Sequence, residues 1–523
     1  MKLHHRLTLL CALLALTSCA QIATVTEVKP KDDPFAAKSS EPLAGLDYHL
    51  AAAGSAWQKL QLDPADMAAR GDYNRAVGRI FGVLRERKLT PWAGPVKVGA
   101  RTLSWRKEAR KEWNPALYEL IPAGQLKIGG TYLKEREIKD GLGVPLVAKR
   151  EADRADDYAP TPHFFYAATG MARFEGSRCV LSMEDPIQTE TVKVGPGTVP
   201  LAADFTAPLA MMLVEMHPKE LGKPRLLHPE KFASTTRISR LEPYDPDKTV
   251  VLVVHGLMSS PATWFPMLNH LRADEDIRRK YQFWFFSYPT GYPYPYSAAI
   301  LRRELDAMEK SYPSDKKLIV MGHSMGGCIS RLLITDSGRR IWDRMFTVPP
   351  EQMDLTPEHK HIITESAIFS HRPEIGRVIF ISAPLRGADK AGGWLGSLGA
   401  RLIKLPADMM ALGRQEEVYE KVAAGQKHLA RFPDSVDTLS PDNDFVKALA
   451  EVPLVPGIPY HTIAGDRGRG DAPDSSDGLV PYWSSHLPGA VSEKIVPSHH
   501  NAQQHPVAFE EVHRILQLHS QTK

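Results

Sequence analysis

The sequence predicts an α/β protein whose second half forms a mostly parallel sheet flanked by helices. Residues 249–254 read TVVLVV, and such a continuous apolar run is typical of a strand that is buried on both faces of a parallel sheet. Further apolar runs alternate with helical patterns, as expected for βαβ units. We expect strands at 249–254, 283–287, 318–321, 378–382 and 461–464, and helices at 297–310, 325–335 and 506–519.

Composition and charge exclude several other classes. The 523 residues are 43% hydrophobic, and the 37 glycines and 42 prolines follow no period, which excludes fibrous, repeat and multi-span membrane proteins. The 65 basic and 61 acidic residues leave a net charge of +4. Because a nucleic-acid binder needs a basic face, we expect no nucleic-acid partner.

The first eighteen residues have the pattern of an export signal. Lys2 and Arg6 precede an apolar run at 7–16 that is too short to span a bilayer as a helix. The letters LTSC then end at Cys19 and resemble a bacterial lipoprotein signal, which is cut before a cysteine that carries a diacylglyceryl group. A plain secretory signal with a chance cysteine is the alternative.

The lipoprotein resemblance implies a membrane anchor at Cys19 and a location in the bacterial cell envelope. Ala20 follows the cysteine, and in the enterobacterial sorting pattern this residue, unlike Asp, directs a lipoprotein to the outer membrane. Loss of Lys2 and Arg6 with the leader lowers the net charge by two, from +4 to +2.

Between the leader and the α/β half we expect a tether and an accessory region. Residues 19–43 are polar and contain three prolines, which predicts a flexible tether. Residues 44–240 show helical periodicity to about position 92 and then short apolar runs broken by Gly and Pro. Nothing in them indicates a chemistry. The short runs are predicted as strands at 163–168, 191–194 and 210–214.

The α/β pattern occupies 241–523. A segment at about 388–450 is helical and lies outside the alternation of strands and helices. Insertions at this point commonly form a lid, and an ordinary pair of surface helices is the alternative.

Two cysteines remain after Cys11 is removed and Cys19 is lipidated. They are Cys179 in the accessory region and Cys328 on a predicted helix of the α/β half. They could pair in an oxidising compartment. Because they fall in different predicted domains, we expect two separate buried thiols.

The strongest chemical motif is GHSMGG at 322–327, which lies between a predicted strand and a predicted helix. A tight strand–turn–helix bend presents a serine hydroxyl above the sheet edge, and glycines two residues away on each side leave room for it. The amino terminus of the following helix favours developing negative charge. The motif predicts that Ser324 is a nucleophile.

A candidate acid follows a late predicted strand. Asp477 lies in SSDGLVP, where the next residue, a glycine, allows a sharp bend. Asp466, just upstream, is the alternative acid, and Asp466, Asp471 and Asp474 could instead form a solvated acidic loop or a cation site.

Two adjacent histidines, His499 and His500, precede the last predicted helix and are the candidate bases. The neutral imidazole of one of them would take the proton of Ser324, while an ionised carboxylate holds its tautomer. Adjacent residues of an extended loop point in different directions, so only one of them can reach the serine.

Five segments together resemble a serine hydrolase of the α/β-hydrolase superfamily, on the lipase and esterase side. The resemblance covers about 245–520, includes nothing in 20–240, and implies an α/β-hydrolase fold. Relatives often have Gly where His499 stands, which favours His500 as the base. The segments are VVHGL, GHSMGG, SAPLRG, DGLVPYWSS and VPSHHNAQQHP.

The resemblance also implies a catalytic triad and an oxyanion hole. The triad follows the chain order serine, acid, histidine and would consist of Ser324, Asp477 and His500. The backbone N–H groups of Leu257 and Met325 would hold the oxyanion. His255, just before this loop, is expected to support the loop rather than to transfer protons.

The implied activity is cleavage of an acyl or lipid-like carboxylic ester through an acyl-enzyme. The fold also hosts other reactions, so an envelope acyltransferase or phospholipase with the same triad is an alternative, as is a noncatalytic interaction protein. Aromatic residues after the second strand could line an acyl pocket or pack on the core: Phe286, Tyr288, Tyr292, Tyr294 and Tyr296. No phosphate loop, dinucleotide fingerprint or metal-ligand cluster occurs, so we expect no cofactor and no metal.

Overall fold

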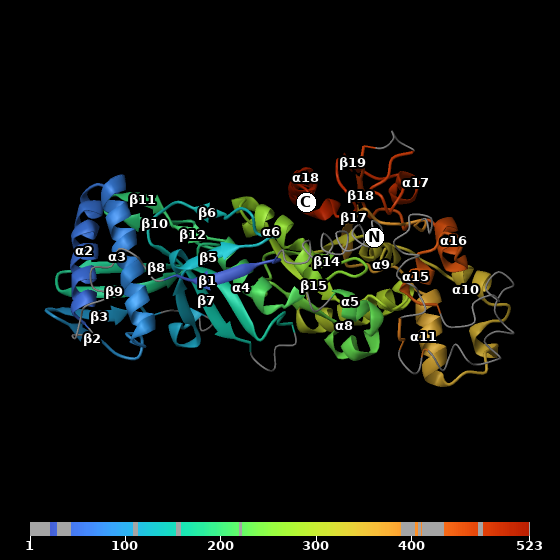
Figure 1. Cartoon of the computed structure of the whole chain (residues 1–523), viewed down its shortest axis with the longest axis horizontal. Helices are drawn as coiled ribbons and strands as arrows, with labels where there is room; N and C mark the ends of the chain where they lie inside the picture. The colour runs from blue at the N-terminus through green and yellow to red at the C-terminus, as the bar shows by residue number, and fades with distance from the viewer. Residues whose placement is uncertain are drawn as a thin grey trace, which may run out of the picture. The chain divides into compact units, whose positions relative to one another are not determined.

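A computed structural model describes most of the chain and divides it into two compact units (Figure 1). The first unit comprises Met1–Asp156 and Thr161–Met216, and the second comprises Asp157–Pro160 and His217–Lys523. The leader, Cys19 and most of the predicted lid lie outside the described residues. These are 21–28, 43–107, 113–152, 158–218, 222–388, 403–405, 409, 433–468 and 474–521.

The first unit packs a helical pair on a six-stranded sheet. Its helices are α2 (Ala44–Leu62), α3 (Met67–Glu86) and α4 (Thr206–Glu215). The sheet contains, in spatial order, β2 (Val96–Val98), β3 (Arg101–Trp105), β9 (Arg178–Glu184), β8 (His163–Glu175), β7 (Val144–Glu151) and β4 (Glu119–Pro122). The described part of the first unit also contains three separate two-stranded sheets. They pair β1 (Thr24–Glu27) with β5 (Leu126–Gly129), β6 (Ile138–Lys139) with β12 (Ala203–Asp204), and β10 (Thr191–Val194) with β11 (Gly197–Pro200).

The predicted helical region and two of the three predicted strands of this unit are confirmed. The apolar face of α3 is buried, and its Tyr73 hydroxyl donates to the carbonyl of Ala172 in β8 and accepts from the N–H of the same residue. The third strand, at 210–214, is wrong because these residues form part of α4. That helix is buried almost all round, and a helix of this kind has a continuous apolar run like that of a buried strand.

The prediction of a flexible tether over all of 19–43 is wrong in part, because residues 24–27 form a paired strand. Strand β1 pairs antiparallel with β5, and the Arg85 guanidinium donates two 2.8 Å hydrogen bonds to Glu27. The carbonyls of Gln21 and Ile22 accept from the N–H groups of the segment after β5. The polar composition suggested an unstructured segment, but a short edge strand needs few apolar residues.

The second unit is built on a seven-stranded sheet. In spatial order the strands are β13 (Arg237–Arg240), β15 (Tyr281–Ser287), β14 (Thr249–Val254), β16 (Leu318–His323), β17 (Ile375–Ile381), β18 (Tyr460–Gly465) and β19 (Ser492–Val496). Neighbouring strands are parallel except β13, which is antiparallel to β15. All five predicted strands are confirmed. The accessory region predicted at 44–240 is therefore too long, because its last residues form the edge strand β13 of this sheet.

Helices surround the sheet of the second unit (Figure 1). The three helices predicted in this half are confirmed as α8, α9 and α18, although α9 ends earlier than expected. Among the described residues the helices are α5 (Gly222–Leu227), α6 (Phe265–Leu271), α7 (Glu275–Lys280), α8 (Tyr294–Ser311), α9 (Met325–Leu332), α10 (Arg340–Met345), α11 (Pro357–Ala367), α15 (Ser435–Thr438), α16 (Asp444–Glu451), α17 (Tyr482–Ser485) and α18 (Pro506–Gln521).

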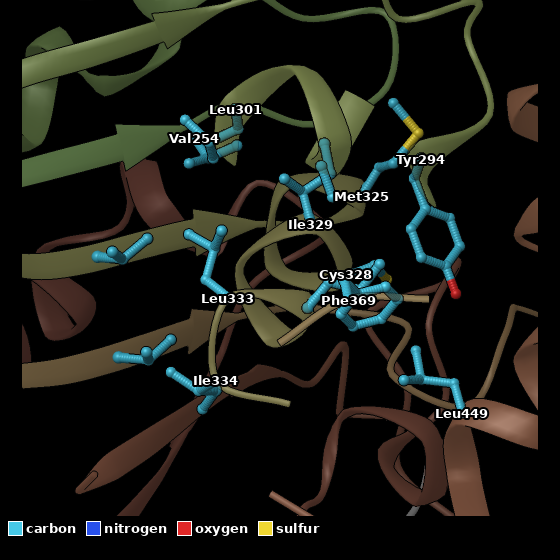
Figure 2. Packing of buried hydrophobic residues seen from close by; sticks show 14 of the residues in the cluster. Val254, Tyr294, Leu301, Met325, Cys328, Ile329, Leu333, Ile334, Phe369 and Leu449 are labelled. Carbon is cyan, nitrogen blue, oxygen red and sulfur yellow. The ribbon is translucent and has the colours of Figure 1, made fainter. Parts of the chain in front are cut away.

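The sheet is buried on both faces, which explains the apolar run of β14. One face of this strand packs with α8 and α9 in a large hydrophobic core, to which Val254 and Cys328 belong (Figure 2). On the other face, Phe285 of β15 stacks on Phe265 of α6, and the Tyr281 hydroxyl donates to a carbonyl of α18. Both Cys179 and Cys328 are free buried thiols, as expected.

No helix among the described residues is long and apolar enough to cross a bilayer.

Replacing Gly130 tests the docking of β1. A Cβ at this residue would lie 2.5 Å from backbone atoms of the chain just before β1, and its φ of +125° strains any other residue. We expect Gly130→Ala to lower the free energy of unfolding of the first unit by about 1–3 kcal/mol and to speed hydrogen exchange in β1. The control is Gly124→Ala, where a Cβ meets nothing within 4 Å. Equal exchange in both variants would contradict this docking.

Candidate active site

The candidate nucleophile lies in a strained bend between β16 and α9. Ser324 has φ 54° and ψ −128°, a conformation that L residues rarely adopt and that proteins retain mainly at functional sites. Its N–H donates to the carbonyl of Ile381 at 2.9 Å, so the neighbouring strand β17 holds the bend. The residue is 6% exposed.

Two glycines of the motif lie where neighbouring parts of the chain leave no room for a side chain. A Cβ at Gly322 would lie 2.5 Å from the carbonyl oxygen of Gly326, and one at Gly327 would lie 2.3 Å from the Cβ of Ala383. A Cβ at Gly256, in the loop after β14, would lie 2.8 Å from the Cβ of Ser324. Side chains at these positions would therefore push apart the three segments that surround the serine.

One histidine joins the serine to a carboxylate. His500 Nε2 lies 2.8 Å from Ser324 Oγ, and His500 Nδ1 lies 2.8 Å from Asp477 Oδ2. A carboxylate can only accept, so Nδ1 carries the proton and Nε2 is left to accept from the serine hydroxyl. The three residues follow β16, β18 and β19, and the ends of parallel strands meet at one edge of the sheet.

Hydrogen bonds keep Asp477 ionised in a buried place. Its side chain is 1% exposed, and burial alone would raise the pKa of the carboxyl. The bond from His500 and the N–H groups of Leu479 and Val480, at 2.8 and 2.7 Å from Oδ1, outweigh burial and hold the pKa of Asp477 below its usual value. A charged carboxylate can then stabilise an imidazolium at His500.

Among the candidates that the structure describes, only His500 is hydrogen-bonded to Ser324 Oγ. His499 is exposed, and the side chain of Asp466 accepts from the N–H of Gly468 instead. Asp474 is exposed, and Asp471 lies outside the described residues. The structure thus brings together Ser324, Asp477 and His500.

The predicted oxyanion residues Met325 and Leu257 directly follow Ser324 and Gly256 in the sequence. Met325 is the first residue of α9, so its N–H has no acceptor within the helix. Leu257 follows Gly256, which approaches the Cβ of Ser324 closely. Among side chains of the described residues, no group of three or more His, Cys, Asp or Glu could hold a metal.

His255 supports the loop after β14. Its Nδ1 donates to the carbonyl of Gly256 at 3.1 Å, and its ring stacks on Tyr288 with centroids 4.5 Å apart. The Tyr288 hydroxyl donates to the carbonyl of His255 at 2.6 Å. Burial lowers the pKa of His255 to about 3, so the imidazole is neutral.

Most aromatic residues proposed for an acyl pocket are core residues. Phe286, Tyr288 and Tyr294 belong to the main core of the second unit. Tyr292 is buried in a separate cluster with Ile362, against which Tyr296 packs half-buried. Packing on the core, the alternative, therefore describes these residues.

Sequence reasoning missed one residue that contacts the site. His323 precedes the serine, and its Nε2 lies 2.8 Å from the carbonyl oxygen of His500. Its place inside the nucleophile motif was the available signal, but no local pattern indicates a contact across 177 positions.

Comparisons with known proteins bear on the second unit. Residues 250–512, half of the chain, match a sequence model described as the alpha/beta hydrolase family. The mature Bacillus licheniformis lipase BlEst2 is 19% identical, with 53% of this chain and 97% of that chain covered and a TM-score of 0.32. The Staphylococcus hyicus lipase is 14% identical, with 53% and 98% covered and a TM-score of 0.31. No curated protein matches the chain.

Substitution of each adjacent histidine tests which of them acts with the serine. We expect His500→Ala to slow the hydrolysis of p-nitrophenyl acetate by about three orders of magnitude or more, because it removes the proton acceptor. His499→Ala, the matched control, is expected to cost less than about tenfold, because its side chain is exposed and His500 makes the hydrogen bond to Ser324. Reversed effects would assign the base to His499.

Proposed function

Since the chain belongs to the alpha/beta hydrolase family, we propose that it is a serine hydrolase that cleaves carboxylic esters. The observation that carries the proposal is the position of His500, whose two ring nitrogens each lie 2.8 Å from a partner, Ser324 Oγ and Asp477 Oδ2. This arrangement suits a hydroxyl that must lose its proton as it attacks a carbonyl carbon.

The proposed reaction proceeds through an acyl-enzyme. Ser324 Oγ attacks the ester carbonyl while His500 Nε2 takes its proton, and ionised Asp477 stabilises the imidazolium. The N–H groups of Leu257 and Met325 hold the oxyanion of the tetrahedral intermediate. When the intermediate collapses, His500 gives the proton to the departing alcohol. Water, activated by the same histidine, then releases the acid.

The natural ester is expected to be acyl or lipid-like. A panel of p-nitrophenyl esters from C2 to C16, run beside a phospholipid and a thioester, measures the acyl preference. Faster turnover with an added alcohol than with water would indicate an acyltransferase that uses the same three residues.

We also propose that the protein is anchored to the bacterial envelope through Cys19. The support is the leader that ends in LTSC, and Ala20 favours the outer membrane. An ester hydrolase held there would lie beside acyl lipids.

The test of the proposed activity is Ser324→Ala. The hydroxyl is the attacking group, so we expect ester hydrolysis and labelling by a fluorophosphonate probe to disappear. The unfolding transition should change little, because removal of one oxygen leaves no large cavity. Activity of the variant within about tenfold of the wild-type rate would rule out Ser324 as the nucleophile. A wild-type protein that neither hydrolyses esters nor takes up the probe would favour the noncatalytic alternative.

The test of the anchor is Cys19→Ala. A lipoprotein cysteine is the only acceptor of the diacylglyceryl group, so we expect the variant to incorporate no palmitate analogue during growth. The matched control is Cys11→Ala, which lies in the leader and should leave the label unchanged. Equal labelling of Cys19→Ala and wild-type protein would refute the lipoprotein assignment.

A further inference from the structure

The side chain of His323 makes a defined contact with the histidine of the proposed triad. His323 is the last residue of β16 and is 3% exposed. Its Nε2 lies 2.8 Å from the backbone oxygen of His500. A carbonyl can only accept, so Nε2 carries the proton and donates it, and Nδ1 carries none. Nδ1 is buried and has no hydrogen-bond partner among the described residues.

The ring of His323 is confined on two sides. Its Nδ1 lies 3.1 Å from where a Cβ of Gly256 would be, so the loop after β14 packs against this edge. On the other side its centroid lies 5.0 Å from that of the His500 ring. Burial and the neighbouring His500 lower the pKa of His323 to about 3, so it remains a neutral hydrogen-bond donor when His500 becomes an imidazolium.

The backbone of His500 needs an external support. His500 lies between the end of β19 at Val496 and a short 3-10 helix, Ala502–Gln504, and belongs to neither. Its imidazole must nevertheless satisfy two 2.8 Å hydrogen bonds at opposite edges of the ring. A misplacement of about 1 Å can cost on the order of a hundredfold in rate.

We propose that His323 is a positioning residue, which holds the backbone of His500 where its imidazole reaches Ser324 and Asp477 together. His323 is also the residue directly before Ser324 at the end of β16. It would therefore position the nucleophile through the backbone and the base through its side chain. The inference rests on the proposed hydrolase function. His323 touches no reacting atom and transfers no proton.

Two variants separate positioning from mere packing. His323→Gln keeps an amide N–H that can reach the carbonyl of His500, whereas His323→Leu fills a similar volume and donates nothing. We expect His323→Leu to lower kcat for p-nitrophenyl acetate by about tenfold or more, with KM within about twofold. His323→Gln should recover most of this loss. Thermal unfolding of both variants is measured alongside.

A second measurement does not depend on turnover. The Nδ1–H of His500, hydrogen-bonded to Asp477, is expected to give a low-field proton resonance that shifts or broadens in His323→Leu and returns in His323→Gln. Unchanged kcat and resonance in His323→Leu would overturn the inference, and so would equal losses in both variants. If the wild-type protein hydrolyses no ester, the proposed function fails, and the resonance alone decides whether His323 positions His500.

Discussion

The bend of the chain at Ser324 is the constraint on which the candidate site depends. A residue with φ 54° between a strand and a helix is unfavourable by itself, and the surroundings hold it there. The N–H of the serine is fixed by the carbonyl of Ile381, and glycines on both sides let neighbouring backbones approach to distances that a side chain would prevent. The parallel sheet, buried on both faces, is the rigid support that keeps these segments in register.

The charge states of the buried groups around Ser324 are the second constraint on the candidate site. Two histidines beside the site, His255 and His323, are buried and neutral, each with one nitrogen that donates to a backbone carbonyl. The ionised group at the site is Asp477, whose charge is held by N–H groups and by His500. In the proposed reaction, positive charge on His500 would lie beside this anion and beside the neutral ring of His323.

Much of the second unit could be predicted from the sequence because its pattern is local. Strands buried on both faces are continuous apolar runs, and the motif at 322–327 combines a strand, a turn and a helix within a few residues. The residues Asp477 and His500 could be named for the same reason, each beside its own turn. Their meeting could not be derived from spacing, because three separate strands bring them to one edge of the sheet.

The parts that were not predicted depend on tertiary contacts. Helix α4 is buried nearly all round and so has the apolar run of a strand. The contact of His323 with His500 joins positions that no local pattern relates. Strand β1 is polar, and its pairing partner β5 lies about a hundred residues away along the chain.

Strand β1 also changes how a lipid anchor would act. With a flexible tether over 20–43, the first unit could stand about 27 Å from the bilayer on average. Because the carbonyl of Gln21 is already hydrogen-bonded to the folded unit, the chain from the proposed anchor at Cys19 spans about 7 Å at most. The lipid would then hold the first unit close to the membrane surface, with the edge formed by β1 and β5 at the level of the lipid headgroups.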